Sequence, residues 1–364
     1  MKQDFVLPSE TYLLNHSVGR PLKSAESHFK QSYLSPWQDS GREPWQAWLA
    51  IITEFQNALG RLFNSSPMQF CPQVNLSSGL TKLIMALPEL SENSVVLMSA
   101  QDFPSMGFAM QKALPDGATI RYIPEHEDIT QMDVWQQHLT SDVGLVFVSQ
   151  AYSNTGQLAP VNDIVKLAKA NQTLSIIDVA QSAGVLPLDL NDLDADFMIG
   201  SSVKWLCGGP GAAYLWLNQK HIERLAPKDV GWFSHENPFE FDIHHFAYHD
   251  SALKFWGGTP SVAPYAFASH SIDYFAQLGD KLRAHNQILI DLLIQHLGEQ
   301  VVSPHDRYHR SGTVIINPQM GVEAALAACN RAGISLDARA HGLRVSPHIY
   351  NDESDILKLV KALK

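Results

Sequence analysis

Short apolar runs alternate with amphipathic stretches along the middle of the chain, and this alternation constrains the fold more than any other feature. The runs have the length and the bulky side chains of buried strands, and they are Ser94–Met98, Thr119–Ile123, Val143–Val148, Leu174–Asp178, Phe197–Gly200 and Ala212–Leu217. Stretches with helical spacing precede or separate them at Leu80–Leu90, Met106–Leu114, Val134–Leu139 and Asn162–Ala170. This order predicts an α/β fold with a mostly parallel sheet covered on both faces.

The pattern changes after about residue 260. The elements that we expect there are a long helical stretch at Pro264–Leu297, a strand at Thr313–Ile316, a helix at Glu323–Ala332, a strand near Leu343–Val345 and a helix at Glu353–Leu363. They predict a smaller α+β domain. We therefore divide the chain into an N-terminal segment, 1–20, a large domain, 21–258, and a small C-terminal domain, 259–364. Asp229–Thr259 is predicted to be a long loop, of a length that usually carries function.

Composition limits the partners. The formal net charge of -11 argues against nucleic-acid binding, which needs a basic surface. No apolar stretch approaches the roughly 18 residues that span a bilayer, and the N-terminus lacks the profile of a signal peptide. The three cysteines, Cys71, Cys207 and Cys329, form neither a disulfide framework nor a zinc pattern. We expect a cytoplasmic protein without a metal site.

A carboxylate and a lysine follow two of the predicted strands. Asp178 closes the strand LSIID, and Lys204 follows the strand Phe197–Gly200 within SSVKW. Ligands of open α/β sheets bind at the carboxyl ends of the strands. A buried carboxylate keeps a pyridine nitrogen protonated and a lysine holds an aldehyde as an imine, which are the two requirements of pyridoxal 5′-phosphate (PLP). As an isolated pair, these residues are more often a helix cap and a solvated surface charge.

The residues around this pair resemble the class V aminotransferase family, which has PLP fold type I. The matching segments are DVAQSAGVLPLD, which begins at Asp178, and DADFMIGSSVKWLCGGPGA, which contains Lys204. The resemblance implies a large domain with a mostly parallel seven-stranded sheet and a smaller C-terminal α+β domain. It implies a Schiff base on Lys204 and a pyridinium partner in Asp178. It further implies that Gln181 contacts the phenolic oxygen of PLP, and that Ser201 or Ser202 contacts its phosphate.

Three further segments resemble the family in the same order along the chain. Ser77 and Ser78 lie where a helix begins, so they could bind a phosphate, although a serine there is also an ordinary N-cap. Phe103, in QDFPS, resembles the phenylalanine of kynureninases that stacks on the PLP ring. Asn154, in SNTG, resembles the family's Asn-x-x-Gly turn, which implies another cofactor contact.

Two segments are implied to hold the substrate. Arg344, in LRVSP, matches an arginine of the family that binds the substrate α-carboxylate, a task that suits the planar guanidinium. His16 and Ser17, in NHSVG, resemble an N-terminal element that lines the substrate side. The resemblance therefore extends from about residue 12 to residue 360.

Within the family, kynureninases are the most similar. GWFSHE resembles an element whose tryptophan, here Trp232, approaches the cofactor phosphate. WGGTP resembles a turn whose threonine, here Thr259, reaches the neighbouring subunit's site, which implies a homodimer. Met106, Gln181 and Val203 stand where kynureninases have Asp, His and Tyr.

These differences leave several activities open. The leading hypothesis is a kynureninase-like hydrolase or lyase, and the alternative is a class V aminotransferase or a desulfurase-like C–S lyase. A desulfurase would need a mobile cysteine before the arginine motif, whereas Cys329 lies in a predicted helix. A non-catalytic PLP-fold binding protein is a remote alternative. An NAD-binding enzyme is disfavoured because no GxGxxG follows the first strand.

Overall fold

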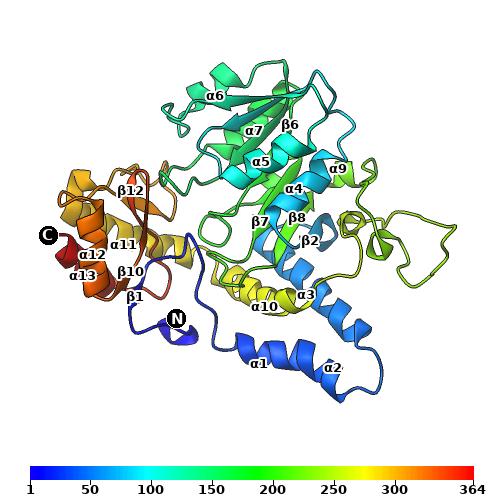
Figure 1. Ribbon diagram of the computed structural model, residues 1–364, viewed down its shortest axis with the longest axis horizontal. Helices are drawn as coiled ribbons and strands as arrows, with labels where there is room; N and C mark the ends of the chain where they lie inside the picture. Colours follow the sequence, from blue (N-terminus) through cyan, green and yellow to red (C-terminus); the bar gives the residue numbers. More distant parts are fainter.

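A seven-stranded sheet forms the centre of the computed structural model, which describes all residues from 1 to 364 (Figure 1). The strand order is β2-β8-β7-β6-β5-β3-β4. The strands are β2 (Phe70–Gln73), β3 (Val95–Ser99), β4 (Thr119–Ile123), β5 (Val143–Ser149), β6 (Leu174–Asp178), β7 (Phe197–Ser201) and β8 (Ala213–Leu217). Every pairing among the strands β3 to β7 is parallel, and β8 is antiparallel to both β7 and β2. The mostly parallel sheet is confirmed.

Both faces of the sheet are buried, as the continuous apolar runs predict. In β5, Val146 and Val148 belong to one apolar cluster, whereas Leu145 and Phe147 belong to the cluster on the other face. The helices around the sheet are α4 (Leu76–Ile84), α5 (Pro104–Ala113), α6 (Met132–His138), α7 (Val161–Ala170), α8 (Leu190–Leu193) and α9 (Gln219–Ile222). α4 begins earlier than the predicted helix at Leu80–Leu90, because the side chain of Asn75 caps it by accepting a hydrogen bond from the Ser78 N–H.

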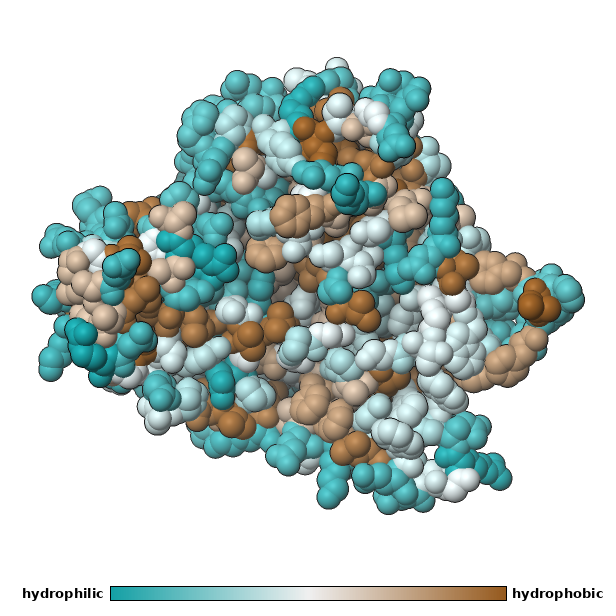
Figure 2. Space-filling view, viewed as in Figure 1, coloured by the Kyte–Doolittle hydropathy of each residue, from teal (hydrophilic) through white to brown (hydrophobic).

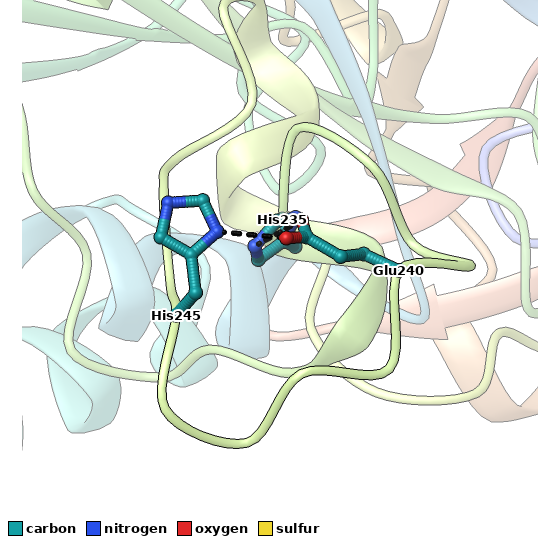
Figure 3. A group of neighbouring side chains, drawn as sticks. All are labelled: His235, Glu240 and His245. Atoms are coloured by element: carbon teal, nitrogen blue, oxygen red, sulfur yellow. Dashed lines mark hydrogen bonds and ion pairs between the residues drawn. The ribbon is translucent and has the colours of Figure 1, made fainter.

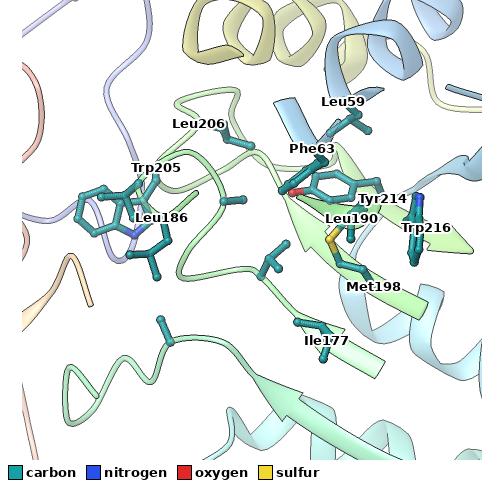
Figure 4. Packing of buried hydrophobic residues seen from close by; sticks show 14 of the residues in the cluster. Leu59, Phe63, Ile177, Leu186, Leu190, Met198, Trp205, Leu206, Tyr214 and Trp216 are labelled. Carbon is teal, nitrogen blue, oxygen red and sulfur yellow. The ribbon is translucent and has the colours of Figure 1, made fainter. Parts of the chain in front are cut away.

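Two long helices pack side by side beneath the β8 end of the sheet (Figure 1). They are α3 (Trp45–Phe63) and α10 (Ala263–Leu278). Figure 4 shows how Phe63 and Leu59 of α3 meet Tyr214, Trp216 and Met198 of the sheet. The first helices of the chain, α1 (Ala25–Phe29) and α2 (Ser35–Asp39), are joined by a π-helical turn.

The long helix predicted at Pro264–Leu297 is two helices. α10 ends at Leu278, the φ of +57° at the next residue, Gly279, suits a glycine at a helix C-terminus, and α11 (Lys281–Leu297) begins after it. Tyr265 and Ile272 of α10 belong to the same apolar cluster as the sheet residues Val146 and Ile177. Apolar packing thus groups α10 with the large sheet, and the domain boundary at residue 259 stays a prediction.

The C-terminal part of the chain forms a smaller α+β unit with its own apolar cluster. Its three-stranded antiparallel sheet has the order β11-β12-β9, with β9 (Val314–Ile316), β11 (Asp337–Arg339) and β12 (Gly342–Val345). Helices α11, α12 (Val322–Arg331) and α13 (Glu353–Leu363) pack around it. Near the N-terminus, β1 (Thr11–Tyr12) pairs in parallel with β10 (Ile334–Ser335), so the start of the chain is attached to this unit.

The segment Asp229–Thr259 is mostly loop, as predicted, with two short 3-10 helices at Trp232–Ser234 and Ala252–Phe255. Its outer end carries exposed apolar side chains, among them Phe241 and Ile243, which are 77% and 93% exposed. Figure 2 shows apolar residues gathered at this projecting end, on the right of the view. None of the helices in the molecule combines the length and the apolar character that a bilayer-spanning segment requires.

Candidate active site

Lys204 lies in a tight turn just beyond the end of β7, and the neighbouring Ser202 fastens this turn. Ser202 is fully buried, and its hydroxyl donates to the carbonyl oxygen of Ala212 over 2.9 Å. The N–H of Gly208 donates back to the carbonyl oxygen of Ser202 over 2.8 Å. The turn that carries Lys204 is therefore tied to the glycine-rich segment after it, which fixes where the lysine leaves the backbone.

The N-terminal segment closes on this turn, and a close approach explains the glycine of NHSVG. The Gly19 N–H donates to the carbonyl oxygen of Val203 over 2.9 Å. A β-carbon at Gly19 would lie 2.1 Å from the carbonyl oxygen of Lys204 and 2.6 Å from Sγ of Cys207. Only a residue without a side chain fits between these atoms.

We expect Gly19→Ala to lower the free energy of unfolding by roughly 1–3 kcal/mol, because the added methyl group must displace the Lys204 turn or the N-terminal segment. Chemical denaturation of the purified protein measures this loss. Gly41→Ala is the matched control, since Gly41 is exposed and an added β-carbon meets nothing within 4 Å. Equal stability of the two variants would contradict the expected crowding at Gly19.

A cavity of about 310 Å³ opens at the carboxyl ends of the central strands. Six of the residues predicted for the site line it, namely Ser77, Phe103, Asp178, Gln181, Ser201 and Lys204. They come from the start of α4, the start of α5, the end of β6 and the turn after β7. These residues thus meet at the carboxyl ends of the strands, where open α/β sheets bind ligands.

Burial sets the charges of the two central groups. Burial lowers the pKa of Lys204, the negative charge of Asp178 opposes this shift, the positive charge of Arg344 adds to it, and the resulting pKa is about 8. Asp178 is 6% exposed, and burial raises the pKa of its carboxyl group, although the Ala180 N–H, which donates over 2.8 Å, opposes the shift. The site therefore holds a lysine that loses its proton near pH 8 and a carboxyl group withdrawn from solvent.

A second carboxyl group, that of the half-buried Asp102, lies beside the cavity and was not predicted from the sequence. Asp102 accepts a hydrogen bond from the Ser149 hydroxyl over 2.7 Å and another from the Ser99 N–H over 2.8 Å. Burial raises its pKa to about 7. Ser149 pairs with Asp178 across β5 and β6 and lines the cavity. The one sign of this group in the sequence was the position of Ser149 at the end of the predicted strand VGLVFVS.

The polar atoms of the cavity fit a ligand such as PLP. Gln181 and Tyr152 are among the residues that line the cavity, and Oε1 of Gln181 and the hydroxyl of Tyr152 are buried without a hydrogen-bond partner within the chain. Buried polar groups normally have partners, because an unsatisfied group costs about 1–3 kcal/mol. Phe103 is 53% exposed, and Nζ of Lys204 lies over its ring, 5.9 Å from the ring centroid. An amine, a carboxyl group, an aromatic face and unpaired polar atoms are the groups that would hold the PLP ring.

Five predicted cofactor contacts lie outside the lining of this cavity, namely Ser78, Asn154, Ser202, Trp232 and Thr259. The N–H of Ser78 is occupied by its cap, and the hydroxyl of Ser202 points into the turn. Trp232 donates from Nε1 to Oγ1 of Thr259 over 3.2 Å, so these two meet each other away from the cavity. Their predicted roles stay predictions.

The predicted substrate residues also lie outside the cavity lining. Ser17 is exposed, whereas His16 and Arg344 are buried and share one partner, Asp337. Gln181 connects this group to the cavity, because its Nε2 donates to the carbonyl oxygen of His16 over 3.0 Å. Arg344 therefore belongs to a network that adjoins the cavity wall.

The family model described as aminotransferase class-V matches residues 77–359. The chain belongs to the class-V aminotransferase family. A kynureninase of Deinococcus radiodurans is 28% identical over 306 residues, which cover 81% of this chain and 73% of that protein. A cystine C–S lyase in complex with cysteine persulfide has a TM-score of 0.88 at 22% identity, with 98% of each chain covered. An apo cysteine desulfurase from Thermococcus onnurineus has a TM-score of 0.86 at 17% identity, covering 99% of this chain and 95% of that chain. These two structures confirm the fold.

Three positions at which the sequence was predicted to differ from kynureninases lie at the cavity. Met106, Gln181 and Val203 are among the residues that line it. None of the three cysteines lines the cavity, and all three are buried. Burial raises the pKa of Cys71 to about 12 and also raises that of Cys329. The chain therefore offers no thiolate at the site.

One histidine group in the long loop has a composition that could suit a metal ion (Figure 3). Nδ1 of His245 lies 3.0 Å from Glu240, and Nε2 of His235 lies 3.6 Å from the same carboxylate. The Asn237 N–H, however, donates to Nδ1 of His235 over 2.9 Å. A neutral ring then carries its proton on Nε2, which faces Glu240 and has no lone pair for a metal. We interpret the group as a polar cluster that holds the loop together.

Proposed function

We propose that this class-V chain is a PLP-dependent enzyme that acts on an amino acid, with Lys204 as the residue that carries the cofactor. The observation that supports this most directly is the meeting of Lys204 and Asp178 in one cavity at the carboxyl ends of the strands. When bound, PLP supplies an electron sink for charge that develops on the substrate.

The chain's own residues supply the remaining functions. Asp178 would hold a proton at the pyridine nitrogen, because a buried carboxylate next to that nitrogen favours its charged form. Lys204, once displaced by the substrate amine, would take the proton from Cα. Its pKa of about 8 lies near working pH, where a general base is most effective. The unpaired polar atoms of Gln181 and Tyr152 would hydrogen-bond PLP or the substrate.

The leading activity is a kynureninase-like cleavage of the substrate side chain. The similarity to a kynureninase over most of the chain supports it, as does the position of Phe103 in the cavity. Side-chain cleavage needs the same first step as every reaction of this site, removal of the Cα proton by Lys204. We further propose a homodimer, because Trp232 and Thr259 lie outside their own chain's cavity and the loop near them exposes apolar side chains.

A C–S lyase or an aminotransferase is the second candidate, and the lining of the cavity favours it. Met106 and Val203 replace an acid and a phenol by apolar groups, which cannot assist hydration of a ketone. Elimination and transamination also begin with removal of the Cα proton, for which Lys204 is the base, and neither requires hydration of a ketone. A desulfurase that attacks with its own thiolate is disfavoured, since no cysteine lines the cavity.

A product assay separates these activities. The PLP-loaded protein is incubated with kynurenine, with cysteine, and with an amino acid plus a keto acid. Anthranilate is expected from kynurenine, by the similarity to kynureninases. Sulfide or a new amino acid without anthranilate would overturn the kynureninase-like assignment in favour of the second candidate. No product from any mixture would overturn both.

A further inference from the structure

The small sheet of the C-terminal unit places an aspartate opposite Arg344. β11 and β12 pair with Asp337 directly across from Arg344, and directly opposed residues point to the same face. Nε of Arg344 donates to Oδ1 of Asp337 over 2.8 Å, and Nη2 donates to Oδ2. The two carboxylate oxygens thus hold one edge of the guanidinium in a bidentate, side-on ion pair.

His16 supports the same carboxylate from the other side. Its Nε2 lies 2.9 Å from Oδ1 of Asp337, and its Nδ1 lies 2.7 Å from the hydroxyl of Ser346. A neutral ring that donates from Nε2 to Asp337 can accept at Nδ1 if the single proton of the Ser346 hydroxyl turns to His16 from the carbonyl oxygen of Leu13, which lies 2.8 Å from Oγ. Burial lowers the pKa of His16 and so favours this neutral ring. His16 is therefore a support of Asp337.

This arrangement leaves one edge of Arg344 free. Nη1 makes no hydrogen bond, and Nη2 keeps a second hydrogen beside the one given to Asp337. The end-on edge, formed by Nη1 and Nη2, is the one that another carboxylate could occupy. Arg344 is 4% exposed, so solvent does little to satisfy these hydrogens.

We propose that Asp337 is a positioning residue, which holds Arg344 by its side-on edge so that the end-on edge binds the α-carboxylate of an amino-acid substrate. This inference rests on the proposed function. Asp337 also cancels the charge of Arg344, so the two effects predict opposite results for its removal. Loss of positioning weakens carboxylate binding, whereas loss of a neutralising charge strengthens it.

The experiment measures binding through the absorbance of the PLP-loaded protein during titration with L-alanine or with ethylamine, which lacks the carboxylate. Asp337→Asn is expected to raise the Kd of L-alanine at least about tenfold, because a bidentate guanidinium–carboxylate pair is strong only while its geometry is held. The Kd of ethylamine is expected to stay unchanged. Asp142→Asn is the control, since it neutralises a bidentate partner of Arg121 at the surface.

Asp337→Glu is a second variant, which tests the inference if Asp337→Asn does not fold. It keeps the charge but moves the carboxylate by one methylene, so a weaker affinity for L-alanine is again expected, and thermal unfolding shows that each variant folds. An unchanged or lower Kd of L-alanine in the folded variants overturns the inference alone. A wild-type protein that responds to neither amine overturns the proposed function and the inference with it.

Discussion

Lys204→Ala is expected to abolish covalent attachment of PLP and to lower turnover by at least about two to four orders of magnitude. The loss has two causes, because the same amine anchors the cofactor and acts as the base at Cα, and general-base catalysis alone contributes about 10²–10⁴. Borohydride reduction followed by peptide mass analysis gives a direct measurement. The peptide that contains residue 204 gains the mass of reduced PLP in the wild-type protein and gains nothing in the variant.

Two other lysines serve as comparisons for the label on Lys204. Lys254 is also buried, and burial lowers its pKa, but its Nζ donates to the carbonyl oxygens of Ile222 and Leu225 and it does not line the cavity. Lys166 is a surface lysine whose side chain is 76% exposed. Lys166→Ala should retain both the label and the turnover. A label found on the Lys254 peptide would falsify the assignment of Lys204.

The same label should report the pKa of Lys204. Only the neutral amine attacks an aldehyde, and burial lowers the pKa of this amine to about 8. The neutral fraction therefore increases as the pH rises through 8. The rate at which the apo-protein takes up PLP is expected to rise between about pH 7 and 9 and then to level off. An ordinary lysine would keep gaining rate up to about pH 10.4.

The sheet was predictable because its strands are buried on both faces and read as continuous apolar runs. The edge strand β2 was not predicted from the sequence. It has only four residues, FCPQ, and its proline is a residue that favours edge strands. The division of the predicted helix at Pro264–Leu297 had a visible signal in Gly279, a common C-terminal residue of helices, but the helical spacing continues on both sides of it.

Site residues were predictable where strand order alone determines their position. Asp178 and Lys204 follow adjacent parallel strands, so any fold with this sheet brings them to one edge. Asp337 was not predictable, because its partnership with Arg344 depends on the register of a short hairpin, and a shift of one residue would turn it to the other face. The roles of Tyr152 and Asp102 could not be predicted, because they depend on how α5 and the turn after β5 pack around these side chains.

Asp178→Asn is expected to leave PLP attached to Lys204 and to lower turnover by about two orders of magnitude or more. The asparagine oxygen still accepts the Ala180 N–H, so the fold at the end of β6 is preserved. An amide, however, has no charge with which to keep the pyridine nitrogen protonated, and electrostatic stabilisation of this kind is worth about 10²–10³ per group. Turnover of the loaded enzyme, together with the borohydride label, separates loss of chemistry from loss of cofactor.

The Asp178 prediction has a second readout that does not depend on turnover. The negative charge of Asp178 raises the pKa of Lys204, so its removal should shift the pH dependence of PLP uptake towards lower pH. Asp102→Asn is the comparison, because Asp102 has a pKa of about 7 and is mostly protonated already at pH 6. At that pH it should lose less turnover than Asp178→Asn. Wild-type turnover in Asp178→Asn, or an uptake curve shifted towards higher pH, would show that Asp178 does not control the charge at this site.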